Sequence, residues 1–432
     1  MLFNRRHFLL SSLALMGVPG GVRAAVASSR PKRLVYVFAD GGWDTSFCLE
    51  PKFGAPDLDG PWVDEQKSNP DDREYEGTYG NYGVVLNDHK RPAVTEFFEN
   101  YGARCSIVSG IWTGAIAHDT SRVRILTGTP SSTRPDLNSI VGAVHGVDRP
   151  LGSVDLSGLS LSGHLAASTG QVGYQSQIAT LLDPYTPFPA ASKDTDRVYP
   201  LHVPAPEDRD AVRAFLKGRA EAFGARHADG GHNDQRIADR LESMARADRF
   251  LVDGASVLES LVPGARPSLE LQVTLGLDLL EKDLCRAVMM ETTQHWDSHD
   301  ENVRQHDYYE STFRGLTYLA EQLDAKGLAD DTLVVVISEM TRTPRINSRN
   351  GKDHWPHCSA LLMGAGFPAG QRFGATNDYL ESERMVLATG ELTPKGDLLK
   401  YDNFAAGLLA GLDIDPGDWF PNVTPFLGWM NP

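Results

Sequence analysis

Short apolar runs recur along the chain, and most of them end directly before polar or glycine residues. Runs of four to eight apolar residues without alternation are typical of strands that are buried on both faces, as in a parallel sheet. The pattern therefore predicts five strands of a buried sheet. They are expected at Leu34–Ala39, Cys105–Ser109, Ala287–Met290, Leu333–Ile337 and Ser359–Met363.

Apolar residues at helical spacing lie between these runs. They repeat every three to four positions near residues 206–262 and again over residues 309–323, which predicts helices in both places. A further helix is expected to begin near residue 119. Residues 51–91, rich in Pro, Asp, Gly and Asn, predict a long ordered loop. Strands that alternate with helices indicate an α/β fold with a mostly parallel central sheet and helices on both faces.

The first 27 residues have the order of segments found in an export signal. Arg5 and Arg6 precede a short apolar run, and small residues follow, with candidate cleavage sites after Ala24 and Ala27. The run is shorter than the roughly 20 residues that a membrane span needs. Paired arginines at this place are the feature read by the twin-arginine translocase, and an ordinary secretory signal is the alternative.

These features predict the organisation of the chain. We expect a twin-arginine signal peptide at 1–27 and a single domain at 28–432, with a helical insertion near 206–262. The protein would cross the inner membrane already folded, reach the periplasm or the medium, and keep no transmembrane anchor after cleavage. Export in the folded state often accompanies a bound metal or cofactor.

Charge and cysteine content narrow the function classes. The formal net charge of the 432 residues is −16 at pH 7, and an acidic surface argues against binding nucleic acid through its phosphates. The four cysteines are far apart in sequence, so no metal-type cysteine pair exists. Both a disulfide and buried free thiols stay open for Cys48, Cys105, Cys285 and Cys358.

Acidic and histidine residues gather at the ends of the predicted strands. In open α/β sheets, ligands bind beyond the carboxyl ends of the parallel strands. Mixed carboxylate and imidazole sets suit one or two divalent ions, Zn²⁺ or Mn²⁺, with Mg²⁺ or Ca²⁺ favoured if carboxylates dominate. The candidates after strands are Asp40, Asp44, His118, Asp297, His299 and Glu339, and those before the last strand are Asp353 and His354.

The segment from His118 to Gly128 carries a second signal. Its Ser-Arg-x-x-x-Leu-Thr-Gly ending resembles the nucleophile motif of sulfatases, in which a Cys or Ser stands three residues before the Ser-Arg pair. His118 occupies that position here, so the usual nucleophile is absent. A metal ligand, a nucleophile, a general acid–base group and a helix cap are all open roles for His118. Thr120 and Ser121 are alternative hydroxyl nucleophiles.

Several segments, in order along the chain, resemble the domain-of-unknown-function 1501 family of the alkaline phosphatase-like superfamily. The segment Ser338–Asn347 is similar to the family's Glu-Phe-Gly-Arg-Thr-Pro-x-x-Asn, with Met340-Thr341 in place of Phe-Gly. His118 matches the family's histidine in its second motif. The other matching segments are Gly41-Gly42-Trp43-Asp44, Trp296-Asp297-Ser298-His299, Gly351-Lys352-Asp353-His354 and Gly364-Ala365-Gly366.

The resemblance implies an alkaline phosphatase-like fold and a metal site. By position it implies metal ligation by Asp40, Asp297, His299, Glu339 and His354. Met340 stands where alkaline phosphatases carry a histidine, so two ions, one or none stay open. Arg342 is expected to bind a phosphate or sulfate group, because its planar fork matches such anions; a surface ion pair is the alternative.

The implied activity is that of an exported, metal-dependent hydrolase of phosphate or sulfate esters. The substrate would be a small molecule or a polymer, and nucleic acid is not expected. The missing nucleophile and Met340 favour an alternative, a non-catalytic periplasmic binding or assembly protein on the same fold. No nucleotide-binding glycine pattern or cofactor cysteine set supports a redox enzyme.

Overall fold

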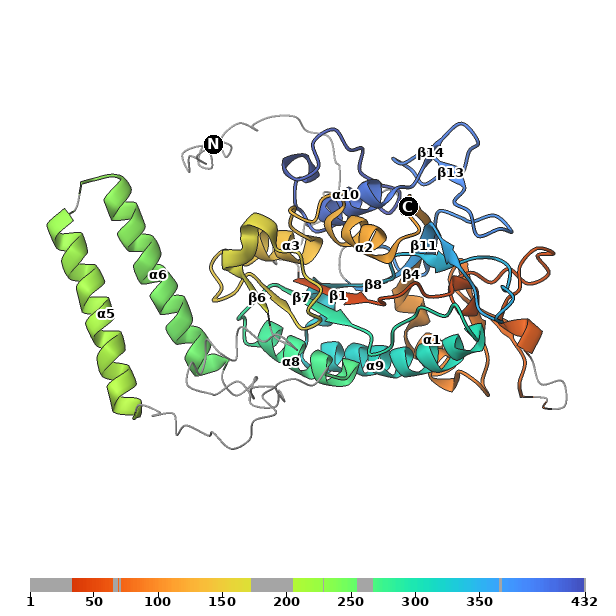
Figure 1. Ribbon diagram of the computed structural model, residues 1–432, viewed down its shortest axis with the longest axis horizontal. Helices are drawn as coiled ribbons and strands as arrows, with labels where there is room; N and C mark the ends of the chain where they lie inside the picture. The colour runs from red at the N-terminus through yellow and green to blue at the C-terminus, as the bar shows by residue number, and fades with distance from the viewer. Residues whose placement is uncertain are drawn as a thin grey trace, which may run out of the picture. The chain divides into compact units, whose positions relative to one another are not determined.

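The centre of the molecule is an eight-stranded sheet (Figure 1). The computed structural model describes residues 33–64, 69, 71–171, 205–227, 229–254, 267–364 and 367–430. These residues belong to one compact unit that begins at Lys32. The expected signal peptide at 1–27 lies outside the described residues. No helix among the described residues is long and apolar enough to cross a membrane.

The strand order of the sheet is β12-β4-β11-β8-β1-β7-β5-β6. Strand β11 pairs antiparallel with both of its neighbours, whereas every other neighbouring pair is parallel. The expected mostly parallel sheet is therefore confirmed, with one reversed strand. The strands are β1 (Arg33–Phe38), β4 (Cys105–Trp112), β5 (Ser153–Asp155), β6 (Thr169–Gln171), β7 (Ala287–Glu291), β8 (Thr332–Ile337), β11 (His357–Gly364) and β12 (Gln371–Phe373).

Alternate side chains of each central strand enter two hydrophobic cores. In β1, Val35 and Val37 join one core, and Leu34, Tyr36 and Phe38 join the other. Because both faces of the strand are buried, its sequence is a continuous apolar run. Helices α1 (Pro92–Tyr101), α8 (Leu269–Glu281) and α9 (Gln305–Ala325) cover the first face, and α2 (His118–Thr127), α3 (Leu137–His145) and α10 (Tyr401–Gly411) cover the second (Figure 1).

The composition of residues 51–91 predicted a long ordered loop, but the structure shows that this segment is not one continuous loop. They contain an antiparallel hairpin of β2 (Tyr75–Tyr79) and β3 (Tyr82–Leu86). Most of β2 is exposed, so it lacks the apolar run by which the buried strands are recognised. The expected helices near 206–262 are present as α5 (Pro206–His227) and α6 (His232–Asp253).

The remaining strands form short ribbons outside the central sheet. Strands β9 (Thr341–Arg342) and β10 (His354–Trp355) pair antiparallel, which places His354 opposite Arg342. Strands β13 (Arg384–Met385) and β14 (Asp397–Leu398) form a second ribbon. All four cysteines are free and buried, so no disulfide joins these segments.

Gly41 lies in the turn after β1, where the chain passes close to the segment after β7. Its φ is +113°, and a Cβ atom there would lie 2.6 Å from the backbone nitrogen of Trp296 and 2.8 Å from that of Asp297. Because these neighbours are backbone atoms, they cannot move aside as a flexible side chain would. The turn at Gly41 thus sets how closely β1 approaches the loop that carries Asp297.

We predict that Gly41→Ala lowers the free energy of unfolding by about 3 kcal/mol or more, because backbone strain and steric overlap add. Gly54→Ala is the matched control, since Gly54 has φ +81° with nothing within 4 Å of its added Cβ. Its free energy of unfolding should fall by only about 1–2 kcal/mol, because the added Cβ brings backbone strain but no steric overlap. Urea unfolding of both variants measures the difference, and equal losses would contradict the close approach.

Candidate metal centre

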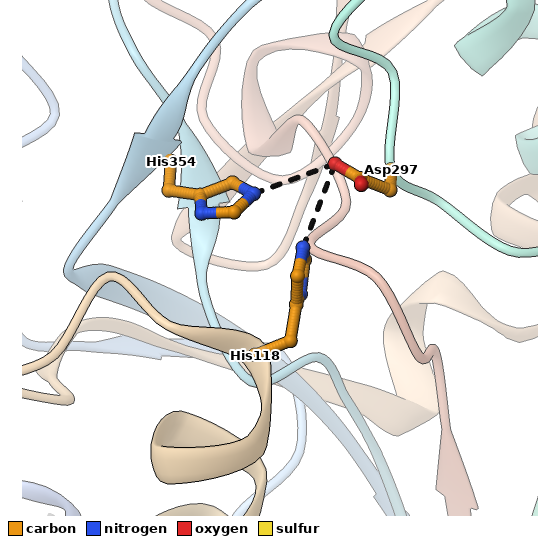
Figure 2. Close-up of side chains that lie close together, drawn as sticks. All are labelled: His118, Asp297 and His354. Atoms are coloured by element: carbon orange, nitrogen blue, oxygen red, sulfur yellow. Dashed lines mark hydrogen bonds and ion pairs between the residues drawn. The ribbon is translucent and has the colours of Figure 1, made fainter.

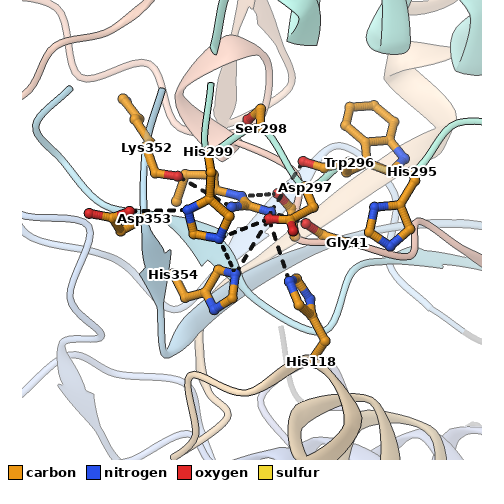
Figure 3. Close-up of polar contacts among 12 residues, drawn as sticks. Gly41, His118, His295, Trp296, Asp297, Ser298, His299, Lys352, Asp353 and His354 are labelled. Atoms are coloured by element: carbon orange, nitrogen blue, oxygen red, sulfur yellow. Dashed lines mark hydrogen bonds and ion pairs between the residues drawn. The ribbon is translucent and has the colours of Figure 1, made fainter. Parts of the chain in front are cut away.

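Four side chains from three separate segments converge beyond the carboxyl ends of the parallel strands (Figures 2 and 3). Ligand atoms of His118, Asp297 and His354 all lie within 4.8 Å of one another. The Oδ1 atom of Asp297 is 3.5 Å from Nε2 of His118 and 3.4 Å from Nε2 of His354. It is also 3.2 Å from Nε2 of His299, which lies 2.9 Å from Nε2 of His354.

The direction of each strand explains the convergence. His118 begins α2, which follows β4, and Asp297 and His299 follow β7. Both strands run in the common direction, so both segments leave the sheet at the same edge. His354 precedes β11, and since β11 runs the opposite way, its start lies at the edge where the other strands end.

Each of the three imidazoles is held through its other ring nitrogen. Nδ1 of His118 lies 2.7 Å from Oε1 of Glu339, and Nδ1 of His299 lies 3.1 Å from Oδ1 of Asp353. Nδ1 of His354 lies 2.5 Å from the carbonyl oxygen of Ile116. Carboxylate and carbonyl oxygens only accept hydrogen bonds, so each Nδ1 carries the proton and donates it. In a neutral ring, Nε2 is then left with a lone pair.

Three lone pairs and one carboxylate oxygen therefore face the same small volume. Such an arrangement is repulsive unless a cation or a proton lies among the atoms. Burial lowers the pKa of His354 and favours its neutral ring, whereas the hydrogen bond to Glu339 raises the pKa of His118. At His118, a metal ion would accordingly compete with a proton for Nε2.

Asp297 remains ionised in this environment. Burial would raise its pKa, but the charge and hydrogen bond of Arg342, followed by the charges of His299 and His118, outweigh burial and lower the pKa to about 2. The site therefore presents a full negative charge at neutral pH.

Arg342 lies beneath the site and not in its opening. The side chain is fully buried, and its Nη2 is 2.8 Å from Oδ1 of Asp297. The rest of the guanidinium donates to backbone carbonyls, and because the side chain has no exposed surface it is not placed for the expected direct contact with a substrate anion. The geometry gives Arg342 a positioning role. The carbonyl acceptors belong to Gly41, Gly42, Trp296 and Lys352.

Glu339 and Asp353 stand behind the histidines. The carboxylate of Glu339 is fully buried, and besides His118 it accepts hydrogen bonds from the backbone of Gly41 at 2.8 Å and from Ser338 Oγ at 2.9 Å. Asp353 fixes the ring of His299, a bond that lowers the pKa of Asp353. Carboxylates in this place orient a metal-binding imidazole and raise its basicity.

Asp40 and Asp44 lie outside the convergent group. Oδ1 of Asp40 is 3.1 Å from Nη1 of Arg122, and its Oδ2 is 3.7 Å from Nε2 of His295. Burial raises the pKa of Asp40. Asp44 is completely buried, and one of its oxygens is 2.8 Å from the Nζ of Lys352. Neither carboxylate is in the group of close ligand atoms, and each pairs with another side chain.

Three residues beside the site were not singled out from the sequence. Arg122 lies one helical turn after His118, a spacing that places both on one side of α2. His295 precedes Asp297 by two residues, and Lys352 lies within the Gly-x-Asp-His segment. The i,i+4 spacing could have pointed to Arg122, whereas nothing in the sequence marks Lys352 as a buried cation.

The donor set fits one divalent ion. For metal–nitrogen distances of about 2.0–2.1 Å, the edges of a tetrahedron around Zn²⁺ are roughly 3.3 Å long, and the contacts to Asp297 Oδ1 are 3.2–3.5 Å. Imidazole and carboxylate together suit Zn²⁺ or Mn²⁺. Nε2 of His118 is buried and has no hydrogen-bond partner among the described residues, as expected of an atom that awaits a ligand. Met340, fully buried beside Gly42, adds no donor for a second ion.

The C-terminal part of the chain matches a known family. Residues 264–389 match the profile of the family described as "Protein of unknown function (DUF1501)". The resemblance carried by the Trp-Asp-x-His, Glu339 and Gly-x-Asp-His segments is thereby confirmed over this range. No curated protein matches the chain.

Three solved structures resemble the chain in fold. The structure of Ps i-CgsB with k-i-k-neocarrahexaose has 10% identity over 93% of this chain and 76% of that chain, with a TM-score of 0.43. The PsFucS1 sulfatase from Pseudoalteromonas sp. has 11% identity over 92% of this chain and 70% of that chain, with a TM-score of 0.40. A protein in the alkaline phosphatase superfamily from Vibrio parahaemolyticus has 9% identity over 89% of this chain and 67% of that chain, with a TM-score of 0.33. Such distant likenesses transfer no activity to this chain.

We predict that Arg342→Met destabilises the fold by about 3–5 kcal/mol, because it leaves Asp297 unpaired and several buried carbonyls without a donor. The matched control is Arg345→Met in the same segment. Arg345 is about half exposed and pairs with Asp57 and Asp59 at the surface, so its loss should cost no more than about 1 kcal/mol. Similar urea midpoints for the two variants would refute the positioning role of Arg342.

Proposed function

We propose that this chain is an exported, metal-dependent hydrolase of phosphate or sulfate esters. One observation supports this above the others: three imidazole Nε2 atoms face the ionised carboxylate of Asp297, and each ring is locked by an acceptor at Nδ1. Such a set is built to bind a cation. It lies at the edge of the sheet where ligands of open α/β folds bind.

Asp297, His299 and His354 would hold the ion. A bound divalent ion would supply positive charge for the ester oxygens as negative charge develops on them. Arg342 keeps the Asp297 carboxylate in place, and Asp353 keeps the His299 ring turned inward. This proposal takes the ion to be Zn²⁺ or Mn²⁺ and the substrate to be a small-molecule or polymeric ester.

Arg122 is a partly exposed cationic side chain on α2, the helix that begins at His118. About a quarter of it is exposed, and it contacts Asp40 and Asp119. An ester oxyanion next to His118 would lie within one helical turn of its guanidinium, which suits phosphate and sulfate groups. We assign to Arg122 the anion-binding role that the sequence had suggested for Arg342.

The paired arginines at the start of the chain fit this function. A protein that crosses the inner membrane folded can take up its metal in the cytoplasm before export. We therefore propose that the twin-arginine translocase is a transient partner, that residues 1–27 are removed, and that the mature protein acts in the periplasm or beyond without a membrane anchor.

One observation favours a second candidate, a non-catalytic binding or assembly protein. His118, Asp297, His299 and His354 together offer four donors, and a four-coordinate ion held by four protein ligands is typical of structural sites. Catalytic zinc sites keep one position open for water or substrate. The two candidates differ in whether the purified protein turns over esters.

We predict that purified protein contains one Zn²⁺ or Mn²⁺ per chain and hydrolyses 4-nitrophenyl phosphate or 4-nitrophenyl sulfate. Chelation should abolish turnover, and the same ion should restore it. Asp297→Asn should weaken metal binding at least about 10-fold. Asp300→Asn in the same loop is the matched control, because Asp300 is exposed and pairs only with Arg349 at the surface.

Metal content by mass spectrometry and the two aryl ester assays check this prediction. Protein that binds one ion tightly but is inert toward both esters would support the binding or assembly protein. Protein that binds no ion and ignores added Zn²⁺ and Mn²⁺ would refute the metal-dependent function.

A further inference from the structure

His118 differs from the other two histidines of the centre in its Nε2 atom, which has no hydrogen-bond partner among the described residues, whereas Nε2 of His299 and Nε2 of His354 contact each other. The Asp297, His299 and His354 atoms form a tight triangle with sides of 3.2, 3.4 and 2.9 Å. His118 reaches this triangle at Asp297 Oδ1, at 3.5 Å, the longest of the four contacts. Three protein donors thus contact one another, and the Nε2 atom of His118 points toward Asp297 without a hydrogen bond to any of them (Figure 2).

The other ring nitrogen of His118 is held by a carboxylate. Oε1 of Glu339 lies 2.7 Å from Nδ1 and is itself fixed by the backbone N–H of Gly41. Because Nδ1 keeps its proton for this bond, the lone pair of the neutral ring is on Nε2. A buried carboxylate at this place also stabilises the ring when it becomes cationic, as it does during attack by nitrogen.

The surroundings of His118 suit an oxyanion. His118 is the first residue of the ten-residue helix α2, and the N-cap residue Ala117 has no side-chain acceptor. The amides of the first helical turn therefore have no partner within the helix, and helix N-termini stabilise negative charge. The Arg122 guanidinium lies one turn further along the same helix.

We propose that His118 is the nucleophile of this site and carries the transferred phosphoryl or sulfuryl group on Nε2. The inference rests on the proposed hydrolase function and gives it a covalent step. It also gives His118 a role other than that of a fourth metal ligand, and so leaves one coordination position open for the substrate.

The step balances as follows for a phosphate monoester. The Nε2 lone pair forms a bond to phosphorus as the bond between phosphorus and the alcohol oxygen breaks, and the departing oxygen takes a proton from water. The proton on Nδ1 stays in its hydrogen bond to Glu339, and the negative charge of Glu339 offsets the positive charge that the ring gains when Nε2 bonds to phosphorus. Water then attacks phosphorus, the N–P bond breaks, its electron pair returns to Nε2, and phosphate and a proton leave.

The test combines metal binding with trapping of the intermediate. Wild-type holoprotein, reacted with 4-nitrophenyl phosphate or sulfate and quenched in alkali within milliseconds, should carry a group on His118 that is stable in base and lost in acid. His118→Asn keeps a donor for Glu339 and removes Nε2. It should bind its ion as the wild type does, form no adduct and turn over at least about 1000-fold more slowly.

Two further variants complete the design. His354→Ala should lose the ion, because His354 is a proposed ligand. His89→Ala is the control histidine, since its side chain is exposed and lies outside the centre, and it should behave as the wild type. Metal content is measured for every variant, which shows whether each has kept the site intact.

Three outcomes would overturn the inference. If His118→Asn loses the ion at least 10-fold more readily than the wild type, His118 is a metal ligand. If the wild type turns over an ester without an acid-labile adduct and His118→Asn keeps more than a tenth of the rate, another group is the nucleophile and only the inference fails. If metal-loaded wild type is inert toward both esters, the inference fails together with the proposed function.

Discussion

The buried guanidinium of Arg342 joins three segments that surround the site. It donates to the carbonyls of the turn after β1, to the loop after β7 and to the segment before β10, and it pairs with Asp297. A charged group without water must have its donors satisfied, so these segments are held at fixed distances from one another. The position of Asp297, the carboxylate that all three histidines of the centre approach, depends on this one side chain.

The site contains more hydrogen-bond acceptors than donors. The Nε2 lone pairs of its histidines and the carboxylate of Asp297 can be satisfied only by a cation or a proton. Glu339, Asp353 and the carbonyl of Ile116 accept hydrogen bonds from Nδ1 of the three histidines, and Arg342 keeps Asp297 ionised. Each outer contact thereby directs a lone pair or a negative charge inward. Asp40 and Asp44 show the contrast, because Arg122 and Lys352 neutralise them within the protein. In this way the surroundings separate acids that serve the site from acids that stabilise the fold.

The prediction of a metal site at the ends of the strands came from residue types and positions. Comparison with the structure shows which elements and which site residues could be predicted from the sequence. The buried strands were recognisable because burial on both faces demands a continuous apolar run. The exposed strand β2 and the three-residue strands β5, β6 and β12 were not, since short or exposed strands carry no such run. His118, Asp297, His299 and His354 were among the candidates and lie together, whereas Arg342, expected at the substrate, lies beneath Asp297.

The sequence by itself determined which apolar runs are buried strands and which loops contain the acids and histidines that could bind a metal. It also determined that His118 occupies the usual nucleophile position. Only the tertiary structure decided the direction of β11, which brings His354 to the same edge as Asp297 although His354 precedes its strand. It also decided which acids face the centre and which lie behind it. Local propensity and patterning act over a few residues, whereas strand direction and the pairing of buried charges depend on segments that can lie 300 residues apart along the chain, as Gly42 and Arg342 do.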